Sequence, residues 1–195
     1  MASSDPAVVS RAWRTVAEMV ADRGIDASMA RGVGDDEILA LADDNTTFAV
    51  PIAPGLSAVF HWGGQAVKKQ DIFALTGDAK HVILVAASLS AATTKALAAE
   101  AALQGVDMEV FSMQDMQFNV TRHSLVPRHE RVPPAEDAAL LKTLNVTSRF
   151  QLPVILNTDP VARYLNLSHG ELVRVHRASP TSGTTVAYRC CYHVS

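Results

Sequence analysis

The chain has 195 residues, of which 48% are hydrophobic and 19% charged, and its net charge is −3 at pH 7. This composition excludes an intrinsically disordered chain, a collagen-like or coiled-coil fibre and a disulfide-rich scaffold. No apolar run reaches the roughly 18 residues that a membrane helix requires, and the first residues lack the pattern of a secretory signal. We therefore expect an intracellular protein without a membrane partner.

Charge is distributed unevenly along the chain. Residues 1–121 carry 8 Lys and Arg against 15 Asp and Glu, a balance of −7, whereas residues 122–195 carry 9 against 5, a balance of +4. Such asymmetry suggests two units with different surfaces, and we place the domain boundaries at 1–121 and 122–195. The overall negative charge argues against bulk attraction to nucleic acid.

The first predicted element is a helix over residues 5–23. Its apolar positions recur at helical spacing and form one face: Val9, Trp13, Val16 and Val20. Residues 24–45 are acidic, which favours a solvated loop or helix face over a site for a hard cation.

Short β-like runs follow at residues 46–50, 56–61 and 81–87. The last of them, HVILVAA, is continuously apolar, as expected for a strand that is covered on both faces. A helix over residues 88–105, capped by Ser90, and a strand over residues 106–111 come next. This strand–helix–strand order predicts a parallel pair and an α/β fold for the N-terminal unit.

From residue 122 onward, prolines punctuate the chain. Short helices are predicted over residues 134–144 and 158–167, each with proline in the first turn. Two alternating runs at residues 172–178 and 184–194 flank a turn at 179–183, which predicts an antiparallel hairpin. The C-terminal unit is therefore predicted to be a small α+β module.

The sequence contains no strong catalytic signature and no pattern that calls for a cofactor or a metal ion. A metal-dependent nuclease on an α/β unit needs an acidic residue followed by Glu-x-Lys on the next strand. The strand here offers Glu109 and then Phe111, so the lysine is missing. The missing lysine argues against nuclease activity, and a stand-alone metal-dependent nuclease is kept only as an alternative function.

The predicted helix after residue 88 begins with hydroxyl groups and one cation. Its first turn presents backbone N–H groups and the positive end of the helix dipole, which suits a phosphate of a DNA backbone without sequence specificity. Ordinary capping with a soluble face explains the same residues. The candidate DNA-proximal residues are Ser88, Ser90, Thr93, Thr94 and Lys95.

Several segments of the C-terminal part occur in the order of a known family. Residues 119–129 read NVTRHSLVPRH and residues 159–165 read DPVARYL. Shorter segments are QLP at 151–153, GELVRV at 170–175, TSG at 181–183 and YR at 188–189. This part resembles the fifth subunit shared by eukaryotic nuclear RNA polymerases, whose shorter archaeal counterpart corresponds to this C-terminal part alone.

The N-terminal part resembles the eukaryotic form more weakly, at residues 9–24 and 82–97. Where the family has Thr-Pro-Ser-Ala close to downstream DNA, this chain has Ser90-Ala91-Ala92-Thr93 and lacks the proline. The resemblance implies an N-terminal jaw with a nuclease-like but inactive α/β fold, and a C-terminal assembly module. It also implies a non-catalytic subunit that docks on the largest polymerase subunit, with other core polymerase subunits as further partners and weak, non-specific contact to downstream double-stranded DNA.

The matching segments supply the candidate partner-binding residues. Prolines restrict the chain before binding and arginines form forked hydrogen bonds, so both suit a docking surface. The candidates are Leu125, Val126, Pro127, Arg128, His129, Asp159, Pro160, Arg163, Tyr164, Gly170 and Arg174. An exposed hairpin can also add to a partner's sheet.

The resemblance implies the nucleus as the location. The divergent, alanine-rich N-terminal half also fits a protist, or a large DNA virus with its own polymerase, for which a viral factory or a virion is the alternative. A free adaptor that uses the assembly module is a further alternative function.

Overall fold

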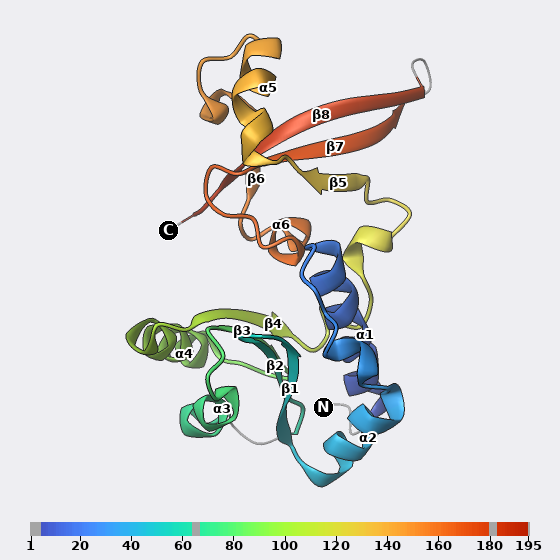
Figure 1. The fold of residues 1–195 in the computed structure, drawn as a ribbon, viewed down its shortest axis with the longest axis vertical. Helices are drawn as coiled ribbons and strands as arrows, with labels where there is room; N and C mark the ends of the chain where they lie inside the picture. Colours follow the sequence, from blue (N-terminus) through green and yellow to red (C-terminus); the bar gives the residue numbers. More distant parts are fainter. Residues whose placement is uncertain (1–4, 64–66, 180–182, 195) are drawn as a thin grey trace. The chain divides into compact units, whose positions relative to one another are not determined.

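The computed structural model describes residues 5–63, 67–179 and 183–194. The chain divides into two compact units, Met1–Phe118 and Asn119–Ser195, here called the N-terminal and the C-terminal unit (Figure 1). Each unit has its own four-stranded sheet, so the protein is a mixed α/β protein. Thr181 and Ser182 of the TSG segment and residues 1–4 lie outside the described residues. No helix in the described ranges is both long enough and apolar enough to cross a bilayer.

The N-terminal unit alternates helices and strands. Its helices are α1 (Ala7–Asp22), α2 (Asp35–Asp44), α3 (Lys69–Thr76) and α4 (Ala91–Gln104), with a 3-10 turn at Ala30–Gly32. Its strands are β1 (Thr47–Ala53), β2 (Leu56–His61), β3 (His81–Ala86) and β4 (Asp107–Ser112), in the sheet order β1-β2-β3-β4. Strand β1 is antiparallel to β2, whereas β2, β3 and β4 are parallel. The predicted parallel pair around α4 is therefore confirmed.

Helices cover both faces of this sheet (Figure 1). On one face the Trp13 ring of α1 meets Phe60 edge-on, with 6.2 Å between ring centroids. The predicted apolar face of α1 is confirmed, because Val9, Trp13, Val16 and Val20 are all buried. On the other face Ile72 of α3 and Leu97 of α4 pack in one cluster with the strands.

Three local features differ from the sequence prediction or extend it. The acidic stretch contains α2, whose Ile38 and Ala42 are buried one turn apart while acidic residues fill its first turn. Helix α3 was not predicted, because a helix of 8 residues gives little periodic signal. Strand β1 continues through Pro51, which the sheet tolerates because β1 is an edge strand.

The C-terminal unit is built on a long hairpin. Its strands are β5 (Arg128–Arg131), β6 (Val154–Leu156), β7 (Leu172–Ser179) and β8 (Gly183–Tyr192), in the order β5-β7-β8-β6. Its helices are α5 (Asp137–Thr143) and α6 (Pro160–Tyr164), with 3-10 turns at Val120–Arg122, Pro134–Glu136 and Arg149–Gln151. The predicted hairpin is confirmed, since β7 and β8 are antiparallel up to the pair Ser179 and Gly183.

One helix lies on each face of the C-terminal sheet, α5 on one and α6 on the other (Figure 1). Leu140 and Leu141 of α5 pack with Leu172 and Cys190. Both cysteines are buried and unbridged, as expected for neighbours on a strand that point to opposite faces.

Candidate protein-binding surface

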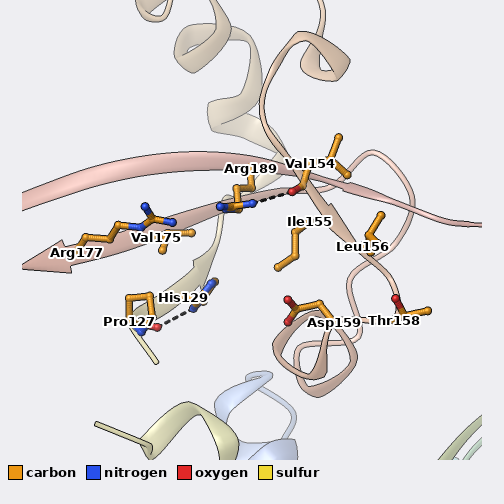
Figure 2. Close-up of a pocket in the computed structure, with 10 residues that line it drawn as sticks. All are labelled: Pro127, His129, Val154, Ile155, Leu156, Thr158, Asp159, Val175, Arg177 and Arg189. Carbon is orange, nitrogen blue, oxygen red and sulfur yellow. Dashed lines mark hydrogen bonds between the residues drawn. The ribbon is translucent and has the colours of Figure 1, made fainter. Parts of the chain in front are cut away.

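A groove of about 520 Å³ opens on the α6 side of the C-terminal sheet (Figure 2). Its floor is apolar, because Ile155 of β6 and Val175 of β7 are buried side chains. The remaining lining residues are Pro127, His129, Val154, Leu156, Thr158, Asp159, Arg177 and Arg189. Four stretches of chain far apart in the sequence thus contribute to one concave surface.

Hydrogen bonds hold the walls of the groove in place (Figure 2). The His129 Nδ1 atom lies 2.7 Å from the Pro127 carbonyl oxygen, which fixes the turn into β5. Arg189 donates to the Val154 carbonyl oxygen at 2.8 Å and so ties β8 to β6. Asp159 accepts from the Val161 backbone N–H at 2.8 Å and caps α6.

The groove therefore combines an apolar floor with guanidinium groups. The Asp159 carboxylate of the groove serves a helix cap, and neither Arg177 nor Arg189 forms an ion pair with a carboxylate among the described residues. A surface of this kind suits a polypeptide that carries acidic side chains, because a guanidinium forms two parallel hydrogen bonds to one carboxylate.

The structure brings together only part of the predicted partner-binding set. Pro127, His129 and Asp159 line the groove. Leu125 is 86% exposed and Val126 is half-buried in the turn before β5, whereas the Arg128 side chain points to solvent. The LVPRH segment therefore divides into two groove residues and a separate exposed turn.

Arg174 lies on the opposite face of the sheet from the groove. Successive residues of a strand alternate in direction, so Arg174 points away from the side on which Val175 and Arg177 lie. Its guanidinium is 2.9 Å from a Glu136 carboxylate oxygen and sits over the Tyr188 ring at 5.9 Å. This arginine therefore pairs within its own unit.

Two other candidates are interior residues. Tyr164 is 3% exposed, and its hydroxyl accepts from the Asn119 side-chain amide at 2.8 Å. Gly170 is buried at a φ of +82° and its carbonyl accepts from Arg149 at 3.0 Å. Both positions favour a role in packing and chain geometry. Pro160 and Arg163 belong to α6, where the proline occupies the first turn.

The hydroxyl groups at the start of α4 serve mainly as caps. Ser90 accepts from the Thr93 backbone N–H at 3.1 Å, and its hydroxyl lies 2.8 Å from that of Thr93. The Thr94 hydroxyl donates to the Ser90 carbonyl oxygen. Ser88 and Lys95 are exposed beside this cap. The five candidates thus do lie together, with three of them engaged in local hydrogen bonds.

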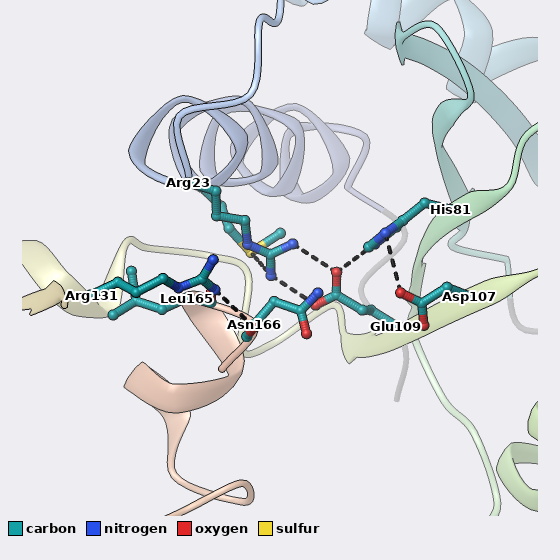
Figure 3. Close-up of polar contacts among 8 residues, drawn as sticks. Arg23, His81, Asp107, Glu109, Arg131, Leu165 and Asn166 are labelled. Atoms are coloured by element: carbon teal, nitrogen blue, oxygen red, sulfur yellow. Dashed lines mark hydrogen bonds and ion pairs between the residues drawn. The ribbon is translucent and has the colours of Figure 1, made fainter. Parts of the chain in front are cut away.

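Glu109, the carboxylate of the nuclease alternative, is held in a polar cluster of the N-terminal unit (Figure 3). Both of its oxygens accept hydrogen bonds of 2.7 Å from Arg23, and His81 Nε2 lies 2.7 Å from one of them. Burial alone would raise the pKa of Glu109, but the hydrogen bonds from His81 and Arg23 outweigh it and the pKa lies below its ordinary value. With both oxygens engaged, Glu109 is a structural anion in this fold.

The described residues contain no group of three or more His, Cys, Asp or Glu side chains placed to hold a metal ion.

Sequence reasoning missed seven of the groove-lining residues: Val154, Ile155, Leu156, Thr158, Val175, Arg177 and Arg189. Strand β6 has 3 residues, which is too short for a strand signal. Both arginines lie on the predicted hairpin, where alternation assigns Arg177 to the Val175 face and the register of β8 against β7 adds Arg189 to it. What the sequence did not reveal is that β6 and the α6 cap close a groove over that face.

Comparison with known proteins identifies the class of protein to which this C-terminal unit belongs. Residues 118–191 match the family model described as RNA polymerase Rpb5, C-terminal domain, and this span covers all but the last four residues of the C-terminal unit. The chain is 47% identical over 72 residues to the DNA-directed RNA polymerase subunit Rpo5 of Methanocaldococcus jannaschii, 37% of this chain and 91% of that relative. The chain belongs to the Rpb5 family of RNA polymerase subunits, which confirms the predicted resemblance.

Eukaryotic relatives extend the similarity. The chain is 34% identical over 110 residues to the DNA-directed RNA polymerases I, II, and III subunit rpabc1 of Dictyostelium discoideum, covering 56% of this chain and 55% of that protein. It is 34% identical over 85 residues to the RNA polymerase V subunit 5A of Arabidopsis thaliana, which is 44% of this chain and 38% of that protein. The chain thus spans about half or less of the length of these eukaryotic relatives.

Proposed function

We propose that the chain is a non-catalytic subunit of a multisubunit DNA-directed RNA polymerase and that its C-terminal unit docks on the largest subunit. One observation carries this proposal. The Methanocaldococcus relative, which is named as a polymerase subunit, is matched over 91% of its length by 72 residues of this chain, about the length of the family match at residues 118–191. A unit that constitutes a whole subunit elsewhere must contain the contacts for assembly.

The shape of the unit supports docking. The groove offers an apolar floor beside two guanidinium groups, and Leu125 is 86% exposed in the neighbouring turn. Two buried residues of the family segments, Tyr164 and Gly170, form hydrogen bonds inside the unit and so stabilise the structure beneath this surface. An exposed apolar side chain next to a concave surface is a common anchor in protein interfaces.

The N-terminal unit is proposed as the jaw, near downstream double-stranded DNA. Ser88 and Lys95 are exposed at the start of α4, where backbone N–H groups and a cation suit one phosphate contact. The acidic balance of this unit predicts that such contact is weak and non-specific, with DNA held mainly by other subunits.

The state of Glu109 supports the absence of nuclease activity. Arg23 and His81 occupy the carboxylate that a metal-dependent nuclease would use as a ligand, and Phe111 stands where the lysine would be. Incubation of the purified protein with DNA and a divalent metal tests this alternative. Cleavage that Glu109→Ala abolishes would refute the non-catalytic role.

The nucleus is the proposed location, because the Dictyostelium relative is named as a subunit of RNA polymerases I, II, and III, which are nuclear enzymes. If a virus encodes the chain, the corresponding place is a viral factory or the virion.

Affinity purification from the source cells tests the proposed function. The tagged chain is expected to retain the two largest polymerase subunits through size-exclusion chromatography. A free adaptor would elute at low mass without them, and that result would overturn the proposal.

A further inference from the structure

Strand β8 has one open edge over part of its length. β7 pairs with β8 along the whole hairpin, but β6 pairs with it only at Cys190, Cys191 and Tyr192. From Thr184 to Tyr188, no described strand lies against the side of β8 that faces away from β7. This segment, residues 184–188, is called the β8 edge below.

The direction of the backbone groups on this edge follows from hydrogen bonds further along the strand. The Cys190 N–H donates to the Pro153 carbonyl on the β6 side, whereas the Cys191 N–H donates to the Glu171 carbonyl on the β7 side. Because antiparallel strands alternate between the two directions, Thr184, Val186 and Tyr188 present their N–H and C=O groups outward. The β8 edge therefore offers three residues' backbone groups over roughly 17 Å.

The composition of this edge differs from that of the edge strands β1 and β5. Exposed edges in natural proteins are blunted by charged residues, proline or short strands, because a bare edge pairs with other chains. Edge strand β1 contains Pro51, and edge strand β5 has 4 residues that include Arg128 and Arg131. The β8 edge reads TTVAY, with no charge and no proline, and Val186 is 41% exposed.

We propose that the β8 edge binds an extended strand of another polymerase subunit, which continues the sheet in line with β6. This inference rests on the proposed function and names the contact through which docking occurs. Backbone hydrogen bonds would supply the affinity, and side chains on either face would supply the specificity.

Charge indicates the chemistry of the added strand. Arg177 pairs with Thr185 across the hairpin, so it shares a face with Arg189 and both line the groove beside the edge. Within the described ranges no carboxylate pairs with either guanidinium. An added strand with acidic side chains on this face would neutralise them, whereas a second copy of this unit would bring further arginines against them.

Amide hydrogen exchange of the assembled polymerase, resolved to single residues, tests the proposal without a mutation. In the purified free chain, the amides of Thr184, Val186 and Tyr188 should exchange rapidly, whereas those of Thr185 and Ala187 should be protected by β7. In the co-purified complex, the three outward amides should slow at least 100-fold.

Each other outcome of this experiment has a separate meaning. Unchanged exchange of the three amides in an intact complex would overturn the β8 contact and leave the proposed function standing. Failure of the polymerase subunits to co-purify would instead overturn the proposed function. Protection that depends on the concentration of the isolated chain would identify a second copy as the occupant and would contradict the proposal.

A pair of variants separates backbone pairing from side-chain packing. Val186→Pro removes an outward N–H on an open edge, where proline is tolerated, whereas Val186→Ala keeps the N–H and removes only methyl groups. Retention of the polymerase subunits by the tagged full chain should fall at least 10-fold for Val186→Pro and less than 3-fold for Val186→Ala. Equal losses of retention for the two variants would contradict backbone pairing. Amide hydrogen exchange at Thr185 and Ala187 serves as the control, because their protection shows that the hairpin is intact.

The acidic character of the added strand has its own test. Arg177→Glu should weaken retention at least 5-fold, and the matched charge reversal Lys142→Glu on the exposed side of α5 should leave it unchanged. Equal effects of the two variants would show that net charge, not the groove face, determines retention and would refute an acidic strand at this edge.

Discussion

Arg23 and Glu109 are 86 positions apart in the sequence, yet their side chains meet through two hydrogen bonds of 2.7 Å. Arg23 follows the last residue of α1, and Glu109 lies in the middle of β4 on the sheet face that α1 covers. The Arg23 side chain is 4% exposed and the Glu109 side chain 13% exposed. This ion pair therefore fastens the end of α1 to the parallel part of the sheet.

Removing the charge of Glu109 should destabilise the N-terminal unit. Glu109→Gln keeps the shape of the side chain but removes one charge of a buried ion pair, which typically costs about 3 to 5 kcal/mol. Urea unfolding followed by tryptophan fluorescence measures this loss, because both tryptophans, Trp13 and Trp62, lie in the N-terminal unit. The exposed pair of Lys69 and Glu100 provides the control, since Glu100→Gln should cost less than about 1 kcal/mol.

The same residue should make the stability of this unit dependent on pH. The pKa of Glu109 in the folded protein lies below its ordinary value of 4.5, so the folded state binds this proton less readily than the unfolded chain. The contribution is complete above that ordinary value and is lost as the pH falls below it. The difference in unfolding free energy between wild type and Glu109→Gln should therefore shrink between pH 6 and pH 3. A difference that stays constant over this range would contradict the assignment.

Gly170 should be intolerant of alanine because of its backbone conformation. Its φ is +82°, while a Cβ atom there would meet Arg149 only at an ordinary 3.5 Å, so the cost is strain and not a clash. We expect Gly170→Ala to destabilise the C-terminal unit by about 1 to 3 kcal/mol. Fluorotyrosine NMR during urea unfolding reports on this unit, which contains all three tyrosines. Gly32→Ala in the N-terminal unit, without positive φ or a close neighbour, should change the stability of that unit, followed by tryptophan fluorescence, by less than about 0.5 kcal/mol.

Asp159 should act through its cap on α6. Because asparagine caps as well as aspartate, Asp159→Asn should be nearly neutral, whereas Asp159→Ala should cost about 1 kcal/mol. The same unfolding experiment measures both variants. A loss for Asp159→Asn as large as that for Asp159→Ala would show that the negative charge, and not the cap, stabilises the structure.

Lys95 provides the test of DNA contact by the jaw. Lys95→Glu should weaken binding of downstream DNA by the assembled polymerase and lower the slope of log K against log salt by about 0.9, the value for one phosphate contact. Lys80→Glu is the matched control, because Lys80 is exposed immediately before β3, whereas α4 begins after the other end of that strand. Identical salt dependence for wild type and Lys95→Glu would refute the contact.

Elements with a repeating pattern were predictable from the sequence. The α1 face of Val9 and Trp13 and the hairpin of β7 and β8 follow directly from periodicity. Helix α3 and strand β6 were not predicted, because segments of 8 and 3 residues are too short for a hydrophobic periodicity that stands out from chance. The LVPRH and DPVARYL segments identified the family because they carry specific residues in order, which does not depend on secondary structure.

The site was less predictable than the fold, for a physical reason. A family pattern marks surface residues and buried residues alike, so Pro127 and the interior Tyr164 were both among the candidates. Alternation along β7 separates Arg174 from Arg177, but only the register of the hairpin places Arg189 on the face of Arg177, and only the position of β6 turns that face into a groove. Both depend on long-range pairing that local sequence does not encode.

A photo-reactive residue at Leu125 tests the central claim most directly. This side chain is 86% exposed, so replacing it should leave the fold of the C-terminal unit unchanged. The variant is expressed in the source cells, and the cells are then illuminated. We predict a covalent adduct between the tagged chain and the largest polymerase subunit. An intact polymerase particle that contains the chain but yields no adduct to any neighbouring polypeptide would contradict the account.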